Sequence, residues 1–426
     1  MLRLALTDRS AVYYCKMRDT TVNHFVGLDV GTSMVRCVVG MLDPNGSGRL
    51  SIIGHGSSPN IGMRKGVVVH VDDTAEAIAQ ALTEAERISG VHISRATVNV
   101  NGIHVGGVDS KGVIAVSAAN SEITPQDRQR VEEAATVVNF PPNREIVQFF
   151  AKNYSLDGQY GIKDPVGMRG VRLEVDAHIV TASTPNIRNL DLTLEKAGVA
   201  PNHHTVSSLA SAEAVLSRQQ KEAGTLLLDI GSSTTNLIVV EDGEVHHIAI
   251  IGIGGSYITN DLAIGLKTDL DIAERVKVEH ATLGERKRST ATLTVGTAHH
   301  TFPMDEIQMI TEARVDELFE YVDKELRRVG RSRKLPGGVV LTGGTAKLPG
   351  IADFAREKLQ LAARIGRLQP ISGLVDIVED VSYTTVVGLM ILDMLLLPEP
   401  LLGSSKLSIG GAMGMMDTIL RRFRRN

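Results

Sequence analysis

The sequence contains no tryptophan, and aromatic residues make up only 4% of its 426 residues. This composition argues against an aromatic stacking platform for single-stranded nucleic acid or for sugars. The 45 basic and 49 acidic side chains give a formal net charge of −4, so no global attraction to nucleic acid is expected and none is predicted as a partner. The two cysteines cannot build a disulfide framework, and their number fits a reducing compartment.

Long hydrophobic runs are also missing. The most apolar stretch, Val386 to Leu397, contains Asp393 and is shorter than the ~20 residues that a membrane-spanning helix needs. It is therefore predicted to be a buried core helix. Near the N-terminus, charged side chains interrupt any apolar run and argue against a signal peptide: Arg3, Asp8 and Arg9. Residues 1–24 are expected to form an extension ahead of the first strand.

The remaining pattern predicts an α/β protein. Apolar residues at helical spacing predict helices over residues 73–89, 124–138, 186–197, 208–222, 258–264, 269–280, 304–329 and 351–361. Short apolar runs predict strands over residues 25–29, 35–39, 97–100, 112–116, 171–180, 225–229, 237–240 and 339–341, with residues 231–236 as the turn between two of them. The glycine-rich stretch 157–170 is predicted to be a loop.

The most informative feature is an internal echo. Residues 27–33 (GLDVGTS) are matched by residues 228–235 (LDIGSSTT), and both segments are apolar strands that end in Asp, an apolar residue, Gly and small hydroxyl residues. Glycine lets backbone N–H groups approach anionic oxygens, and hydroxyls add donors, so the pattern suits phosphate binding. The aspartates, Asp29 and Asp229, would repel phosphate but could accept hydrogen bonds from water on a bound Mg²⁺. One such turn is most often a plain hairpin, whereas two copies favour a phosphate site.

Three further elements fit the same pocket. A glycine turn at residues 252–255 precedes a helix whose N-terminus could face the phosphates. The pair Gly343 and Gly344 follows a strand and would let a flat adenine lie against the backbone. Glu274 and Lys277 lie three residues apart on one helix face, although a solvated ion pair is the plainer interpretation of that spacing.

These motifs occur in the order found in the actin, DnaK-chaperone and sugar-kinase ATPase superfamily. From about residue 25 onward the chain closely resembles the FtsA family of actin-like bacterial cell-division proteins. Besides the two Asp turns, the resemblance rests on the turn at 254–255, AERVK at 273–277 and VLTGG at 340–344. It is sharpened by KGVV at 65–68 and by the segments DGQ, GIKDPVGM and VRLE at 157–159, 161–168 and 171–174, which look like the signature of the FtsA insert.

The resemblance implies a two-lobed, actin-like (ribonuclease H-like) ATPase fold with ATP and Mg²⁺ in the cleft, an FtsA-type inserted subdomain and a C-terminal amphipathic helix. The implied division is an N-terminal extension (1–24), a first-lobe core (25–94 and 179–206), the inserted subdomain (95–178), a second-lobe core (207–264 and 336–402), an outer subdomain (265–335) that binds nucleotide and the FtsZ tail, a flexible linker (403–411) and a membrane-targeting helix (412–426).

The resemblance also assigns roles to single residues. Asp29 and Asp229 would hold Mg²⁺ through water, and Glu213 stands at the position that orients the attacking water. The residues expected to contact the nucleotide are Gly31, Thr32, Ser33, Gly231, Ser232, Ser233, Thr234, Gly254, Gly255, Glu274, Lys277, Gly343 and Gly344. Arg314 and Glu317 match the helix positions that meet the C-terminal tail of FtsZ.

Two departures from the family pattern bear on the activity. Met34 stands where relatives usually carry Lys, and Asn236 stands where many carry Asp. The Ser232–Ser233 turn is also less glycine-rich than usual. These departures favour holding ATP over cleaving it, so at most slow ATP hydrolysis is expected.

The C-terminal segment predicts an interfacial helix without any family argument. At 100° per residue its apolar side chains fall within an arc of about 160°, among them Met416, Ile419, Leu420 and Phe423. Its basic side chains lie on the other side: Arg421, Arg422, Arg424 and Arg425. About 14 residues span roughly 21 Å, too short to cross a bilayer, so the helix is expected to anchor the chain to anionic membrane lipids.

Three classes of function remain from the sequence. The favoured one is an adaptor that polymerises, tethers FtsZ filaments to the cytoplasmic face of the inner membrane as a peripheral protein, and works with other division proteins at the septum. A sugar kinase would need a substrate Asp in the cleft, and a chaperone would need a peptide-binding domain; neither is evident. A PilM-like scaffold for pilus assembly shares the fold but lacks the basic terminal helix.

Overall fold

The computed structural model describes residues 24–396, except for 43–49, 117–120, 139–140, 286–288 and 296–297. The predicted extension (His24 aside), the linker 403–411 and the helix 412–426 lie outside the described residues, so the predictions for them are not tested by the structure.

Two central sheets carry the fold. The first contains, in spatial order, β11 (Ala200–Val206), β6 (Arg95–Val100), β1 (His24–Val30), β2 (Met34–Leu42), β3 (Leu50–Pro59) and β19 (Ser372–Gly373). The second contains β18 (Ala363–Ile365), β17 (Val339–Thr342), β12 (Thr225–Ile230), β13 (Thr235–Glu241) and β14 (Glu244–Ile251). In each sheet the strand that ends in the Asp turn, β1 or β12, pairs antiparallel with the next strand and parallel with a later one. The sequence echo is thus a repeated topology.

Helices and short elements complete the two lobes. They are β4 (Met63–Arg64), β5 (Val67–Val68), α2 (Val71–Ser89), α4 (Thr184–Lys196), α5 (Ser207–Val215), α6 (Arg218–Ala223), η1 (Gly344–Lys347), α10 (Ile351–Leu359), α11 (Val375–Val378), η2 (Val381–Tyr383) and α12 (Thr384–Leu395). The glycine predicted to end α2, Gly90, has φ 70° and donates its N–H to Glu86 O, which is a common helix terminus.

The predicted buried core helix is confirmed as α12, which packs on β1 and α5. Its one acidic residue, Asp393, is buried. Hydrogen bonds from Val26 N, Thr97 Oγ1 and Asn202 Nδ2 at 2.8–3.0 Å compensate for its loss of contact with water. Across the described ranges of the chain, no helix is both long enough and apolar enough to cross a membrane.

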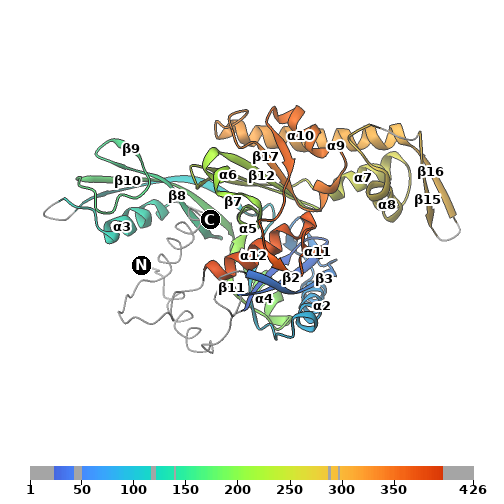
Figure 1. The fold of residues 1–426 in the computed structure, drawn as a ribbon, viewed down its shortest axis with the longest axis horizontal. Coiled ribbons are helices and arrows are strands. Elements are labelled where there is room, and N and C mark those ends of the chain that lie inside the picture. The colour runs from blue at the N-terminus through green and yellow to red at the C-terminus, as the bar shows by residue number, and fades with distance from the viewer. Residues whose placement is uncertain are drawn as a thin grey trace.

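An inserted unit follows β6 and forms one end of the molecule (Figure 1). It contains the sheet β7 (Gly106–Ala115), β10 (Arg172–Ser183), β8 (Arg144–Leu156) and β9 (Gln159–Ile162), covered on one face by α3 (Pro125–Thr136). Thr124 caps α3 by a reciprocal pair of hydrogen bonds with Asp127, and Pro125 occupies the first turn. The start of the helix is therefore determined by local residues. The predicted boundary at residue 95 falls before β6, which the structure places in the first-lobe sheet.

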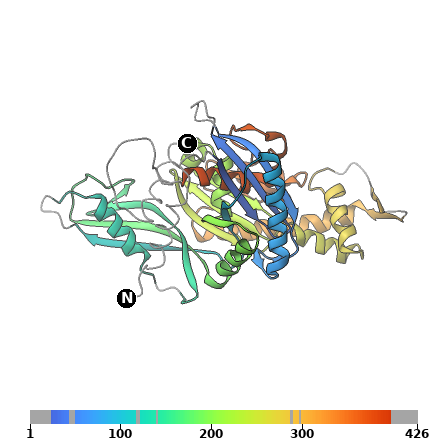
Figure 2. The same cartoon turned by 90° about the horizontal axis from the view of Figure 1, so that it is seen from below.

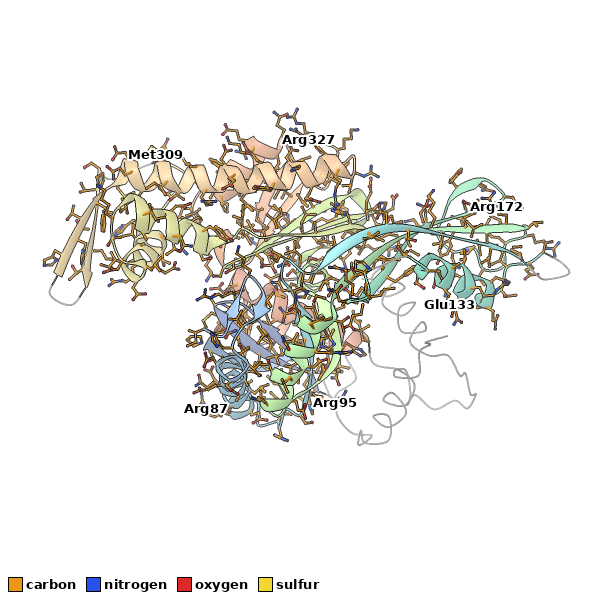
Figure 3. All side chains as sticks on the ribbon, turned by 180° about the vertical axis from the view of Figure 1, so that it is seen from behind. Arg87, Arg95, Glu133, Arg172, Met309 and Arg327 are labelled. Carbon is orange, nitrogen blue, oxygen red and sulfur yellow. The ribbon has the colours of Figure 1, made fainter. Side chains whose placement is uncertain are left out.

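The opposite end of the molecule is a helical unit on the second lobe, as Figure 2 also shows. It contains α7 (Gly255–Gly265), α8 (Leu270–His280), the hairpin β15 (Thr290–Val295) and β16 (Ala298–Pro303), and the long helix α9 (Met304–Arg328). In Figure 3, Met309 and Arg327 mark the two ends of α9, and Glu133 and Arg172 lie on the inserted unit far from Met309. The apolar face of α9 joins the second-lobe core.

Two secondary-structure predictions were wrong, and several strands were not predicted. The single helix predicted over 208–222 is broken at Leu216, whose backbone is extended, and Ser217 starts α6 through a capping box with Gln220. Strands β3, β8, β11 and β14 are among those that were not predicted. In β8, two register shifts against β10 interrupt the alternation of buried and exposed residues. The predicted loop 157–170 contains β9, which pairs with β8.

Candidate functional site

A cavity of about 590 Å³ lies where the ends of β1 and β12 face each other. Thirteen of the sixteen residues predicted to act on nucleotide or metal line it: Asp29, Gly31, Thr32, Ser33, Asp229, Gly231, Ser232, Thr234, Gly255, Glu274, Lys277, Gly343 and Gly344. The structure therefore brings together residues that are more than 300 positions apart in the sequence.

The two Asp turns, predicted to be phosphate turns, have the same backbone hydrogen bond. Gly31 N donates to Met34 O at 3.1 Å, and Gly231 N donates to Thr234 O at 2.9 Å. A Cβ atom at Gly31 would lie 2.7 Å from Met34 O, so only glycine fits this turn. Each turn therefore presents its hydroxyl side chains from a backbone that is fixed by the neighbouring hairpin.

The two aspartates lie buried at the strand ends. Asp29 Oδ1 accepts a hydrogen bond from Asn99 Nδ2 at 2.7 Å, and Asp229 Oδ2 accepts one from Thr385 Oγ1 at 2.9 Å. Burial raises the pKa of Asp29 to about 7; Arg36 opposes this shift, and the nearby Asp229 adds to it. Burial also raises the pKa of Asp229, against the lowering effect of its hydrogen bonds with Thr385 and other partners.

The polar groups at the base of the cavity have the chemistry of a magnesium site. Asn236, the cross-strand neighbour of Asp229, lines the same cavity, and its buried Oδ1 has no hydrogen-bond partner. Two carboxylates and one amide oxygen are all hard oxygen donors, which Mg²⁺ prefers. Among the described residues no three His, Cys, Asp or Glu side chains gather as a metal cluster, so water and phosphate would have to supply the remaining ligands.

We predict a pH dependence for magnesium–ATP binding from this burial. A cation requires Asp29 to be ionised, and with a pKa of about 7 the carboxyl carries a proton below neutrality. Affinity should therefore fall by up to about tenfold per pH unit below pH 7 and should level off above pH 8. Calorimetric titration between pH 6 and 8.5 measures this.

Asp29→Asn is the matched control for that titration, because its amide does not titrate. Its slope should contain only the contributions of the nucleotide's own phosphates and of Asp229, whose pKa is also raised. Equal slopes for the two proteins would remove Asp29 from the metal site.

The start of α7 does not point its first N–H groups into the cavity, contrary to the expectation from the glycine turn. Gly255 N donates to Gly231 O at 2.9 Å and Ser256 N donates to Ser232 O at 2.7 Å. Gly254 is needed for this close approach, since a Cβ there would lie 2.6 Å from Ser232 O. The helix therefore supports the second phosphate turn from behind, and Gly254 does not line the cavity.

Glu274 and Lys277 form more than a solvated pair. Lys277 Nζ donates to Glu274 Oε2 at 2.6 Å, to Thr259 Oγ1 at 2.9 Å and to Gly255 O at 3.2 Å. Thr259 also donates to Glu274. This network joins α8 to α7 and leaves both charged side chains on the cavity wall, where they could meet a ribose or a base edge.

Gly343 and Gly344 have different structural roles. Gly343 has φ 85°, and a Cβ there would lie 2.5 Å from Asp229 Oδ1, so this glycine allows the β17 turn to pass close to Asp229. Gly344 has no atom within 4 Å of its Cβ position. Of the two, Gly344 is therefore the residue that leaves open space in the cleft for a base.

Two further predicted residues do not reach the cavity. Glu213 Oε2 accepts a hydrogen bond from Lys221 Nζ at 2.8 Å, and both side chains are buried in the second lobe. Glu213 therefore does not sit where it could orient an attacking water in this conformation. Ser233 lies behind the turn, with its Oγ 3.5 Å from Ser256 Oγ.

Sequence reasoning missed Arg36. It is the cross-strand partner of Asp29 on β2 and lines the cavity, and its guanidinium lies 5.2 Å from the Tyr383 ring centroid. Met34 was expected to cost the site a cation, but Arg36, two residues further and on the same strand face, supplies one. The sequence signal that could have identified Arg36 was the two-residue periodicity of β2, which places the side chains of residues 34 and 36 on the same face of the strand. Asn101 and Lys347 also line the cavity and were not among the predicted site residues.

Arg314 lies on α9, outside the cavity. Its guanidinium makes a two-pronged contact with Asp261 of α7, with Nε–Oδ2 at 2.5 Å and Nη2–Oδ1 at 2.9 Å, and it also contacts Glu317. The predicted tail-binding pair is therefore adjacent, but its arginine already holds two carboxylates, and an incoming carboxylate would have to share or displace one.

Comparison with known proteins adds an independent result. Residues 226–388 match the family model described as "Cell division protein FtsA", and residues 102–181 match "SHS2 domain inserted in FTSA". The chain is 36% identical over 370 residues to the cell division protein FtsA of Pseudomonas aeruginosa, covering 86% of this chain and 88% of that protein. It is 39% identical over 371 residues to that of Bacillus subtilis, covering 86% and 82%.

Solved structures show the same fold at low sequence identity. A protein of the PilM–PilN type IV pilus biogenesis complex aligns with a TM-score of 0.62 and 17% identity, over 89% of this chain and 99% of that chain. MreB5 of Spiroplasma citri bound to ADP aligns with a TM-score of 0.53 and 12% identity, over 88% and 97%. The two lobes thus have the actin-like arrangement.

Proposed function

Because the chain belongs to the FtsA family of bacterial cell division proteins, we propose that it binds ATP and Mg²⁺, polymerises, and tethers FtsZ filaments to the inner face of the cytoplasmic membrane at the division site. The observation that carries this proposal is the cavity between two matched Asp–Gly turns, with Asp29 and Asp229 buried at its base. In this role the chain is a scaffold of the division septum.

The cavity residues divide naturally among the parts of ATP. Thr32, Ser33 and Ser232 offer hydroxyl donors to the phosphates, Arg36 adds a positive charge, and Lys277 with Glu274 would meet the ribose and adenine edge. Asp29 and Asp229 would hold Mg²⁺, which supplies charge neutralisation to the phosphates when bound. Gly344 leaves room for the adenine face.

ATP hydrolysis by this site should be slow at most. The residue expected to orient a water, Glu213, is committed to a buried ion pair with Lys221, and withdrawing it would leave the lysine charge buried without its partner. This arrangement supports a protein that uses ATP to hold a closed conformation.

The proposed FtsZ-tail site is centred on Arg314 and Glu317. Arg314→Glu is expected to abolish capture of an FtsZ C-terminal tail peptide, because it removes a planar donor suited to a carboxylate and places a third acid beside Asp261 and Glu317. ATP binding should be retained, since Arg314 does not line the cavity. Peptide binding by fluorescence anisotropy measures the first effect, and calorimetry the second.

Arg327→Glu is the matched control for this variant. It makes the same charge reversal on α9, at a side chain that is 68% exposed and pairs with Asp323. Tail binding should survive in Arg327→Glu and be lost in Arg314→Glu. Loss in both would indicate a general charge effect, and retention in both would remove Arg314 from the site.

The membrane contact is assigned to residues 412–426, which lie outside the described residues. Sedimentation with anionic liposomes tests this assignment and the pilus-scaffold alternative together. The full chain with ATP should pellet with the vesicles, and a chain lacking residues 412–426 should remain in the supernatant. A pilus-assembly scaffold without a lipid anchor would show no difference between the two.

A further inference from the structure

The ring of Tyr257 lies within reach of two cations from different parts of the molecule. Lys65 Nζ, from the turn between β4 and β5 in the first lobe, is 5.9 Å from the ring centroid. The guanidinium carbon of Arg314, on α9, is 5.6 Å from the same centroid. Both distances are in the range of cation–π attraction. Tyr257 is thus contacted from across the cleft on one side and from the proposed tail site on the other.

Lys65 is fixed relative to the first phosphate turn. Lys65 and Gly66 have φ of 50° and 75°, the values of a tight two-residue hairpin turn. A Cβ at Gly66 would lie 2.5 Å from Gly102 Cα, so the turn is held closely against its neighbour. Gly66 N also donates to Thr32 Oγ1 at 3.1 Å, which ties the turn directly to a predicted phosphate-binding residue.

Tyr257 is fixed in the same way to the second phosphate turn. It stands in the first turn of α7, whose Gly255 and Ser256 N–H groups bind the carbonyls of Gly231 and Ser232. One helical turn further on, Asp261 lies on the same face of α7 and holds the Arg314 guanidinium. The Lys65–Tyr257 separation therefore follows the separation of the two phosphate turns.

We propose that Tyr257 is a positioning residue that couples closure of the nucleotide cleft to the availability of Arg314 for an acidic peptide. When phosphates draw the two turns together, Lys65 approaches the ring that Arg314 also uses, and the like charges weaken the hold of α7 on Arg314. When the turns separate, Lys65 moves away, and Arg314 retains its contacts with the Tyr257 ring and with Asp261. This inference rests on the nucleotide and tail sites proposed above and adds the link between them.

Because the sequence contains no tryptophan, a single introduced tryptophan can report on the surroundings of residue 257 by its fluorescence. Tyr257→Trp keeps an aromatic face for the cations and gives a protein with a single indole. Its emission should change when ATP and Mg²⁺ close the cleft onto Lys65, and adding Lys65→Met should remove that change. Lys65→Met should also weaken ATP binding by about two- to fivefold in calorimetry, the loss of one exposed cation–π contact.

Tail binding gives a second readout. Wild type and Tyr257→Phe should bind an FtsZ-tail peptide about two- to fivefold more tightly with ATP than without it, whereas Tyr257→Leu should bind equally in both conditions. Rescue by Phe and not by Leu separates the ring from a general packing role.

The two proposals fail in different ways. Absence of ATP binding in calorimetry would contradict the nucleotide site itself. If ATP binds but the indole emission does not change, or if the change persists in Lys65→Met, the coupling through Tyr257 is contradicted. A Tyr257→Leu protein whose affinity for the tail peptide still depends on ATP would contradict it as well.

Discussion

Gly344→Leu is expected to abolish ATP binding while leaving the fold intact. Gly344 lines the cavity, and no atom lies within 4 Å of the position that its Cβ would take, so a leucine side chain extends into open space without a clash. That space is where the adenine is proposed to lie. Affinity should fall at least about 100-fold, equivalent to ~2.7 kcal/mol, with an unchanged melting temperature.

Gly343→Ala is the informative contrast to this variant. Its Cβ would lie 2.5 Å from Asp229 Oδ1, at a φ of 85° that side chains rarely adopt. This protein should lose thermal stability together with ATP affinity, because the turn and Asp229 must both shift. If Gly344→Leu binds ATP as wild type does in a fluorescence titration, the adenine is not held at this turn.

Phe423→Glu is expected to release the protein from membranes. The helix predicted over residues 412–426 would offer about five large apolar side chains, each worth ~1.5–3 kcal/mol if fully buried, and an interface would bury them only partly. Four arginines add ~1 kcal/mol each near anionic lipid, whereas ordering about 14 residues costs ~1–2 kcal/mol each. These contributions nearly cancel, so a single helix should bind weakly, and a charge at the centre of its apolar arc should end binding.

Polymerisation should convert this weak contact into a firm one. Filaments present many helices at once, which raises the apparent affinity by ~10²–10⁴, so liposome binding should rise steeply at the assembly threshold with ATP. Thr418→Glu, which adds the same charge on the polar side of the helix, should still bind. Phe423→Glu protein that pellets with anionic liposomes, or wild-type binding that stays linear through the threshold, would contradict this account.

The repeated Asp turns made the cavity and most of its lining residues predictable from sequence. Their glycines and hydroxyls are local requirements of a phosphate turn, and their repetition reflects two sheets with the same strand order. The Gly343–Gly344 pair was also visible, but its division of roles was not, because it depends on a φ of 85° at Gly343 and on the distance to Asp229.

Other parts of the site depend on register and on distant packing. Arg36 reaches the cavity because it pairs with Asp29 across two strands, and a sequence gives no such pairing directly. Glu213 was expected at the cleft, but the break at Leu216 returns the chain through α6 and brings Lys221 back to it. Tyr257 had no motif at all, since its importance comes from Lys65, almost two hundred residues earlier.

Recruitment of FtsZ to a bilayer tests the central claim most directly. Fluorescent FtsZ polymers are incubated with supported anionic bilayers, the full-length chain and ATP with Mg²⁺, and surface fluorescence is recorded. The account predicts bound FtsZ only when all components are present, and its loss with Gly344→Leu, with Arg314→Glu, with Phe423→Glu or with FtsZ lacking its C-terminal tail. Equal FtsZ on the bilayer without the chain, or with the tail-less FtsZ, would contradict the proposed tether.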